Sequence, residues 1–271
     1  TYAPYDLNVG EWLDFVCEIG GRYAVLVCKH NSGFCIWPTE TTEYSVSRSK
    51  DTTDVVGAFV EECRSRGLWC GLYYNWLDLY HLLEEPMPLP EARARIRAAG
   101  GSQFSDEYWE KTCKQLDELC QWYGDIDILW LDRGGWVAPE HLQQTFVRIK
   151  EHQPDSVVMA NQGFRDGTVL HVWPTDVTNG EDTCPPECGH DPWRTVDGER
   201  CYVPMEVEYR LTKRWFDTFD DELRPLNELR PVFNNALNRN ANLLMNLPPD
   251  RSGRLPQKTK QHVRDLLKNT E

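Results

Sequence analysis

The stretch DILWLDRGG, residues 127–135, combines an apolar run with a carboxylate and two glycines. Its apolar run at 128–131 has the composition of a buried strand, and the run ends on the carboxylate Asp132. Gly134 and Gly135 follow at once and let the backbone turn sharply. An aspartate in this position is either a turn or cap residue, or a functional group at the end of a strand. The order of the other elements has to separate these two interpretations.

Strands and helices alternate along the chain. Apolar runs predict strands at 23–30, 68–75, 126–132, 156–162, 168–174, 201–209 and 241–249, and helical spacing predicts helices at 10–20, 54–67, 106–124, 139–153, 223–237 and 257–269. Short apolar strands between helices indicate a parallel sheet that is covered on both faces. An open doubly wound sheet is the competing architecture, but no Gly-rich phosphate loop follows any predicted strand.

Seven strands in this order predict an α/β fold, specifically a (β/α)8-like TIM barrel. Because no strand precedes the helix at 10–20, we expect the first strand of the barrel to be missing from the chain. We therefore expect a single barrel domain over residues 1–271, from strand two onward. In such a barrel the functional side chains stand at the carboxyl ends of the strands.

The composition excludes some classes of partner. The chain has 271 residues and a formal net charge of −14, from 43 acidic and 29 basic residues. This balance disfavours nucleic acid and anionic membrane, since both attract basic surfaces. No apolar run reaches the roughly 20 residues that span a bilayer, and the first residues do not have the form of a signal peptide. The 11 tryptophans and 11 tyrosines suit a neutral sugar ligand, although most aromatic side chains are core residues.

The ten cysteines do not form the pattern of a disulfide framework. One group, Cys184, Cys188 and His190 with Cys201 nearby, could be a zinc site. Its C-x3-C-x-H spacing matches no strong metal signature, so a disulfide or free thiols are the preferred interpretation. We expect no metal and no cofactor.

Polar side chains gather at the predicted strand ends. They are Asp132, His30, Asn31, Tyr73, Tyr74 and Asn161, together with Glu206 if its strand ends there. Two carboxylates among aromatic rings and a histidine are typical of a glycosidase, in which one attacks the sugar or activates water and the other protonates the leaving oxygen.

The proton donor has to keep its proton near neutral pH. Glu206 lies between Met205 and Val207 and shares a strand face with Glu208, and both features favour the protonated form. Glu181 is the rival for this role. A strand glutamate can also serve as the ion-pair partner of Arg210 or Lys213.

Five ordered segments resemble the retaining α-L-fucosidases of glycoside hydrolase family 29. They are YAVLVCKHNSGFCIW (23–37), GLWCGLYYN (67–75), DILWLDRGG (127–135), VPMEVEYRLTKRWF (203–216) and NRNANLLMNLPPDRSGRL (238–255). The resemblance runs from about Trp12 to Leu255. The combination of the five segments in this order is specific, whereas any one of them alone would not be.

The resemblance implies roles for particular residues. Asp132 would be the nucleophile and Glu206 the acid/base. His30 and Tyr73 would contact fucose hydroxyls, and Trp37 and Trp215 would shape the pocket. Because 206–216 aligns without a gap, we favour Glu206 over Glu181, which matches the acid/base segment of other branches.

The resemblance also implies a reaction and a setting. The family fold is a (β/α)8-like barrel, often followed by a β-sandwich, and it acts without metal or organic cofactor. Its members are exo-acting and retain anomeric configuration through a fucosyl-enzyme ester. The partner would be a fucosylated oligosaccharide or glycoconjugate, and a periplasmic or secreted location is favoured by resemblance only.

Three features depart from the family pattern. Asn31 stands where a second histidine is usual, and VVMANQ (157–162) lacks a common arginine, which Arg165 could replace. We also expect the first strand of the family barrel to be missing, since no segment of this chain resembles it.

Two other functions therefore stay open. One is a retaining glycosidase for a related sugar such as an α-L-galactoside. The other is a carbohydrate-binding protein with an inactive pocket. A retaining enzyme needs its two carboxyls about 5–5.5 Å apart.

Overall fold

The computed structural model describes residues 2–82, 91, 94, 105–132, 137–217 and 222–268. Its contacts divide the chain into two compact units. The first unit comprises residues 1–2, 23–161 and 172–175, and the second comprises 3–22, 162–171 and 176–271.

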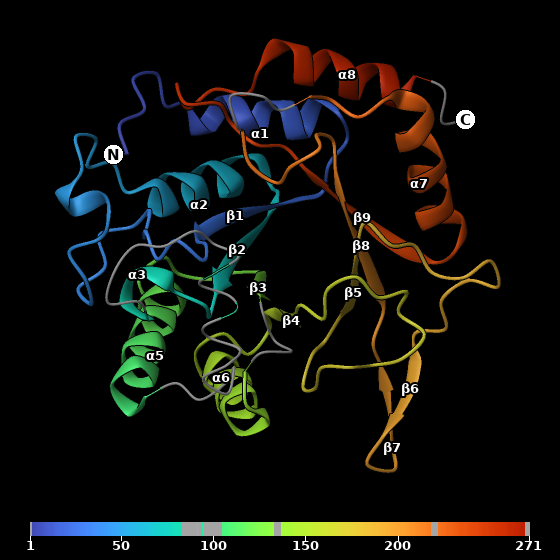
Figure 1. Cartoon of the computed structure of the whole chain (residues 1–271), viewed down its shortest axis with the longest axis horizontal. Coiled ribbons are helices and arrows are strands. Elements are labelled where there is room, and N and C mark those ends of the chain that lie inside the picture. Colours follow the sequence, from blue (N-terminus) through green and yellow to red (C-terminus); the bar gives the residue numbers. More distant parts are fainter. Residues whose placement is uncertain are drawn as a thin grey trace. The chain divides into compact units, whose positions relative to one another are not determined.

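A four-stranded parallel sheet is the centre of the first unit (Figure 1). Its strands stand in sequence order: β1 (Tyr23–Lys29), β2 (Trp69–Asn75), β3 (Ile128–Asp132) and β4 (Val157–Ala160). The register pairs Tyr73 with Trp130 and Asn75 with Asp132. Because all four strands run in the same direction, their carboxyl ends meet at one edge of the sheet.

Helices connect these strands, and their ends follow local sequence signals. They are α2 (Val55–Arg66), α3 (Leu79–Leu82), α5 (Asp106–Gln121) and α6 (Pro139–His152), with a 3-10 turn at Val46–Arg48. The Asp54 side chain accepts from the Gly57 amide at the start of α2, and Ser105 does the same for Tyr108 in α5. Gly67 ends α2 with φ of 66°, the left-handed conformation that favours glycine.

The second unit is built on a three-stranded parallel sheet in the order β5 (Thr178–Glu181), β8 (Met205–Arg210) and β9 (Ala241–Asn246). It also holds α1 (Val9–Glu18), α7 (Leu226–Asn238) and α8 (Gln257–Leu267), and the antiparallel hairpin of β6 (Trp193–Val196) and β7 (Glu199–Tyr202). A core cluster joins α1, α7, α8 and β8 through Phe15, Leu229, Val263, Leu266 and Tyr209.

The predicted helices are all present, with ends shifted by a few residues, and the strands of both sheets are parallel as predicted. The α/β class is therefore confirmed. The described strands form sheets of four, three and two strands and close no barrel. Gly134 and Gly135 lie outside the described residues.

Two strand predictions need correction. Residues 168–174 form no strand, and Val169 is 55% exposed, so this apolar run does not enter a sheet. The predicted strand at 201–209 is two strands, because Pro204 lacks the N–H that would continue one ladder. The polar strand β5 and the strand β6 were not predicted, since neither carries an apolar run.

No helix in the described part of the chain combines the length and apolar character needed to cross a membrane.

Replacing Leu129 with alanine tests the core of the first unit. Leu129 is fully buried in the central strand β3. We expect a loss of about 2–5 kcal/mol in the free energy of unfolding, because the shorter side chain leaves a cavity. Urea denaturation measures it. Val147→Ala, at a position that is 44% exposed on α6, should change stability by less than about 0.5 kcal/mol. Equal losses in the two variants would contradict this packing.

Candidate active site

Asp132 is held by three hydrogen-bond donors at the strand ends of the first unit. Its side chain is buried, and it accepts hydrogen bonds from Tyr73 Oη at 2.5 Å, Asn75 Nδ2 at 2.8 Å and Asn161 Nδ2 at 2.7 Å. These three donors are neutral and come from the ends of β2 and β4. They therefore orient the carboxylate without cancelling its charge.

The rings beside Asp132 form an aromatic wall. Tyr73 stacks on Trp130, with ring centroids 5.1 Å apart, and on the other side His30 lies 5.9 Å from Tyr73 at a plane angle of 22°. Asn31 follows His30 and is buried, and its Nδ2 has no hydrogen-bond partner among the described residues. A donor left in this state is available to a ligand hydroxyl.

Two predicted site residues lie elsewhere in the first unit. Tyr74 is fully buried and donates from Oη to Gln115 of α5 at 2.7 Å. Trp37 is also fully buried and donates from Nε1 to Glu118 of α5 at 2.8 Å. Successive strand residues point to opposite faces, so Tyr73 and Tyr74 cannot both face Asp132. The structure brings Tyr73 and Asn161 to Asp132 and places His30 beside Tyr73, whereas Tyr74 and Trp37 contact α5.

A buried ion-pair network supports the ends of β1 and β2. Lys29 and Asp78 have no exposed side-chain surface, and Lys29 Nζ lies 3.7 Å from Asp78 Oδ2. Lys111 and His81 contact the same oxygen at 3.0 and 2.7 Å. Burial opposes ionisation of Asp78, but the His81 hydrogen bond and the charges of Lys29 and Lys111 outweigh it. They hold the pKa of Asp78 well below its usual range.

This network fixes the turn that carries His30 and Asn31. The Leu79 amide, next to Asp78, donates to the Asn31 carbonyl at 2.9 Å. Gly33 closes the turn with φ of 84°, and a methyl group there would lie 2.1 Å from Asp78 Oδ1. Glycine is therefore required at this position by both the backbone conformation and the close approach.

In the second unit the predicted carboxylates stand on one sheet. Glu206 of β8 is in register with Asn179 of β5 and Asn242 of β9, and Asn242 donates to Glu206 at 3.2 Å. Glu208 shares this face as predicted, and it accepts from Asn179 at 3.0 Å. Both glutamates are buried.

Glu206 does not end its strand, because β8 continues to Arg210 and Glu206 is its second residue. Glu181, in contrast, is the last residue of β5 and is partly exposed. Arg210 and Lys213, the basic residues considered as ion-pair partners of Glu206, pair with other carboxylates. Arg210 pairs with Asp182 through Nε at 2.8 Å, and Lys213 pairs with Glu222 at 2.6 Å.

Trp215, the last predicted pocket residue, follows β8 in the second unit. The guanidinium of Arg210 lies 5.3 Å from the centre of its ring, and its carbonyl accepts from Asn246 Nδ2 at 2.7 Å. These contacts tie the segment after β8 to the end of β9.

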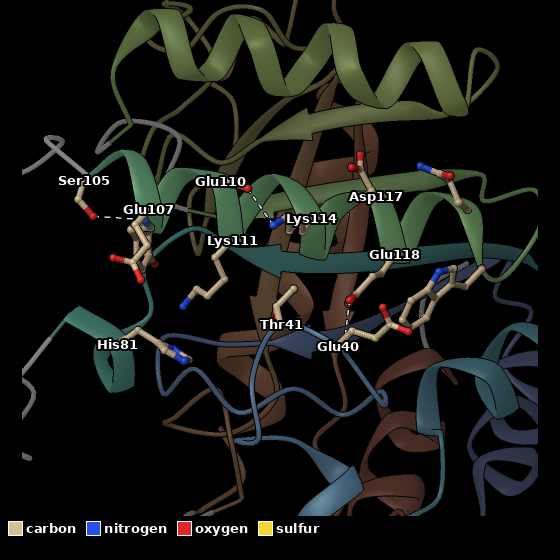
Figure 2. Close-up of a pocket in the computed structure, with 13 residues that line it drawn as sticks. Glu40, Thr41, His81, Ser105, Glu107, Glu110, Lys111, Lys114, Asp117 and Glu118 are labelled. Carbon is tan, nitrogen blue, oxygen red and sulfur yellow. Dashed lines mark hydrogen bonds and ion pairs between the residues drawn. The ribbon is translucent and has the colours of Figure 1, made fainter.

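A cavity of about 920 Å³ lies along α5 in the first unit (Figure 2). Its lining includes Lys111, Lys114, Glu110 and Glu118 of this helix, with His81 and Glu40 from the segments facing it. Charges of both signs are mixed in it, and Asp132, His30 and Tyr73 are not among the residues that line it. The strand ends, rather than this cavity, hold the groups suited to sugar chemistry.

The cysteine group considered for zinc does not converge on a metal site. His190 directs Nε2 to the Val203 carbonyl at 3.0 Å and Nδ1 to Arg194 at 3.2 Å. Cys184, Cys188 and Cys201 are free thiols, and no metal-binding group of three ligands occurs among the described residues.

Sequence reasoning missed Asn75, which donates to Asp132. The signal was present, since Asn75 follows Tyr73 by two residues and so faces the same side of β2. It also missed Asn179 and Asn242, because asparagines within strands carry no apolar signal and their pairing with Glu206 depends on sheet register.

Replacing Asp78 with asparagine tests the buried network. It leaves Lys29 buried without its carboxylate, so we expect a loss of about 3–5 kcal/mol in the free energy of unfolding at pH 7. A carboxyl with a lowered folded-state pKa stabilises above its unfolded pKa of about 3.9 and loses that contribution as pH falls toward the folded value. The gap between parent and variant should therefore narrow below about pH 4.

Urea unfolding of both proteins from pH 7 to 3 measures this gap. Asp265→Asn removes an exposed carboxylate beside Lys268 and should have little effect at any pH. A gap that is constant with pH would show that Asp78 acts through packing instead of charge.

Comparison with known proteins places the chain among carbohydrate-active enzymes. The family model described as alpha-L-fucosidase matches residues 1–269. Alpha-L-fucosidase 1 of Arabidopsis thaliana is 26% identical over 273 residues, which cover 93% of this chain and 49% of that protein. Tissue alpha-L-fucosidase of Homo sapiens is 30% identical over 133 residues, 48% of this chain and 26% of that protein. The chain spans about half the length of the curated relatives that it matches along most of its sequence.

Solved structures share the fold. Alpha-L-fucosidase isoenzyme 1 from Paenibacillus thiaminolyticus has a TM-score of 0.75 at 22% identity. The superposition covers 98% of this chain and 63% of that chain. Alpha-L-fucosidase AlfC from Lactobacillus casei, in complex with the product alpha-L-fucose, has a TM-score of 0.73 at 18% identity. The superposition covers 97% of this chain and 79% of that chain. With the family model matched along nearly its whole length, this chain belongs to the alpha-L-fucosidase family of glycoside hydrolases.

Proposed function

We propose that this chain carries the catalytic groups of an exo-acting α-L-fucosidase, which removes terminal α-L-fucosyl residues from a fucosylated oligosaccharide or glycoconjugate with retention of configuration. The observation that carries the proposal is the Asp132 carboxylate, held by Tyr73, Asn75 and Asn161 at the carboxyl end of a parallel strand. Three neutral donors fix its direction, and a carboxylate held in one orientation can attack the anomeric carbon of a sugar bound beside it.

Asp132 is the proposed nucleophile. One of its oxygens forms a bond to the anomeric carbon while the bond from that carbon to the leaving oxygen breaks. The product of this step is a fucosyl ester of Asp132. Water then attacks the same carbon, fucose leaves, and the Asp132 carboxylate is restored.

A second carboxyl has to donate a proton to the leaving oxygen and then accept one from the attacking water. We keep Glu206 as the proposed acid/base. Its burial and the second carboxyl on the same strand face, Glu208, support this role. The position of Glu181 at the last residue of β5 supports the rival assignment, because functional groups of α/β folds stand at strand ends.

Sugar recognition is proposed for the groups beside Asp132. His30 and Tyr73 present ring edges and polar atoms, and Asn31 has a buried amide nitrogen without a partner among the described residues. Trp215 and Glu181 are further proposed contacts in the second unit. Tyr74 and Trp37 would act by supporting the fold, since both are fully buried.

The proposal also includes the architecture of the fold. The parallel sheets are proposed to be parts of a (β/α)8-like barrel, as the resemblance implies.

A second candidate function is a sugar-binding protein without turnover. The observation that favours it is Asn31. An asparagine binds hydroxyls but cannot carry a proton, unlike the histidine usual at this position.

Replacing Asp132 with glycine tests the nucleophile. The variant lacks the attacking oxygen, so release of nitrophenol from an aryl α-L-fucoside should fall by at least about a thousandfold. Added azide should restore release, because a small anion fits the space of the lost carboxylate. An α-L-galactoside and a β-D-galactoside are assayed beside the fucoside to define the sugar.

The matched control is Asp155→Gly, the same change at an exposed turn, which should keep full activity. Retained activity in the Asp132 variant would disprove the assignment. If the parent chain turns over none of the three glycosides but binds fucose, the sugar-binding alternative is supported.

The acid/base is tested by Glu206→Gln and Glu181→Gln. A substrate with a good leaving group needs little protonation, so loss of the acid should cost far more on an unactivated fucosyl oligosaccharide than on an aryl fucoside. We expect this pattern for Glu206→Gln, with a difference on the order of 100-fold in kcat/KM between the two substrates. The same pattern in Glu181→Gln alone would transfer the role to Glu181.

A further inference from the structure

The β6–β7 hairpin turns aromatic side chains to solvent. Its register pairs Trp193 with Tyr202 and Thr195 with Arg200, so these four side chains share one face. Trp193 is 45% exposed and Tyr202 is 58% exposed. The solvent face of a hairpin is usually polar, and exposed apolar side chains that lie together often mark an interaction site.

The opposite face of the hairpin is held by the second unit. Arg194, on that face, donates to the Gly167 carbonyl at 2.6 Å and contacts His190 Nδ1 at 3.2 Å. Cys201 lies beside it in the register, and both residues are partly buried. The aromatic face is therefore directed away from the unit by the contacts of the other face.

The hairpin is also preorganised. Asp197 and Gly198 form its tip with φ of 51° and 86°, the positive values of the tight turn that suits the twist of two paired strands. The Val203 amide donates to the Pro192 carbonyl at 2.7 Å and extends the pairing beyond the strands. A ligand that binds this face would order little additional chain.

The side chains on this face combine apolar and polar surface. The rings of Trp193 and Tyr202 lie 5.1 Å apart at 67°, and the Arg200 guanidinium lies 4.3 Å from the centre of the indole ring. Thr195 adds a hydroxyl. The four paired positions include no carboxylate on this face, although the chain carries a formal net charge of −14.

We propose that this face, made of Trp193, Thr195, Arg200 and Tyr202, is a second carbohydrate-binding site, which holds a pyranose of the glycan other than the hydrolysed fucose. This inference rests on the proposed function. A pyranose has an apolar C–H face and a rim of hydroxyls, which match the rings and the surrounding donors. Arg200 can donate to hydroxyl oxygens or to an acidic sugar.

The size of the patch favours a sugar over a second copy of this chain. Two half-exposed aromatic side chains offer on the order of 200 Å². A stable protein interface needs about 800 Å² per partner. One or two pyranose rings fit the smaller area.

The hairpin leads into the strand that carries the proposed acid/base, Glu206. β7 ends at Tyr202 and β8 begins at Met205, so the hairpin adjoins the amino end of β8 (Figure 1). Glu181 stands at the carboxyl end of β5, which runs parallel to β8. An aryl fucoside carries no second pyranose for the aromatic face to hold, so its turnover would not need the hairpin, whereas a larger glycan could use both.

The test combines direct binding with turnover. Binding of a defucosylated N-glycan glycopeptide, which lacks the hydrolysed sugar, is measured by calorimetry to the parent chain, to Trp193→Ala and to Tyr202→Ala. We expect each variant to bind about five- to tenfold more weakly. Both should turn over aryl α-L-fucoside as the parent does. The matched control is Trp122→Ala, whose indole is 44% exposed on the first unit and which should change neither quantity.

The outcomes separate this inference from the proposed function. Unchanged glycopeptide binding in both hairpin variants, or no binding by the parent, overturns the second site even if fucoside is hydrolysed. Weakened binding in the variants supports it even if the parent hydrolyses no fucoside. Sedimentation at several concentrations is the remaining check, and a shift from dimer to monomer in the variants would assign the face to a second copy instead.

Discussion

The site depends on the register of parallel strands around one carboxylate. Asp132 ends β3, and its donors Tyr73, Asn75 and Asn161 come from the ends of the two neighbouring strands. A shift of one residue in β2 would turn Tyr73 and Asn75 to the opposite face and remove two of the three donors. The buried residues of β3, such as Leu129 and Leu131, fix this register because they have to stay in the core.

A buried network of charges supports the turn that carries His30 and Asn31. Asp78 and Lys29 are fully buried next to the turn that carries His30, and Lys111 and His81 complete their network. A pair of buried ions contributes little net stability, but it permits few alternative arrangements of the groups that hold it. The network therefore explains how a short turn without regular structure can hold a histidine and an asparagine in place.

The family relation and the geometry support different conclusions. Membership in the alpha-L-fucosidase family follows from the match over residues 1–269. The direction of the Asp132 carboxylate and the aromatic face of the hairpin follow from the coordinates. The chain spans about half the length of these curated relatives, so assays with the sugars themselves have to identify the substrate.

Much of the fold and part of the site could be predicted from the sequence. Apolar runs and helical spacing predicted every described helix longer than one turn, and most of the described parallel strands, because these elements bury a continuous apolar face. Alternation along β2 is sufficient to separate Tyr73 from Tyr74 and to identify Asn75, although the prediction did not apply it there. Residues 168–174 show the limit, since an apolar run forms a strand only where a neighbouring strand accepts it.

The family, the order of the elements and the candidate carboxylates could be read from the chain alone, because these depend on residue types and local spacing. Only the tertiary structure decided which side chains meet Asp132, that Trp37 and Tyr74 lie in the core, and that β8 continues past Glu206 to Arg210. It also decided that Trp193 and Tyr202 form one exposed face. The physical reason is that strand register and packing join residues far apart in the chain, and no local pattern records those partners.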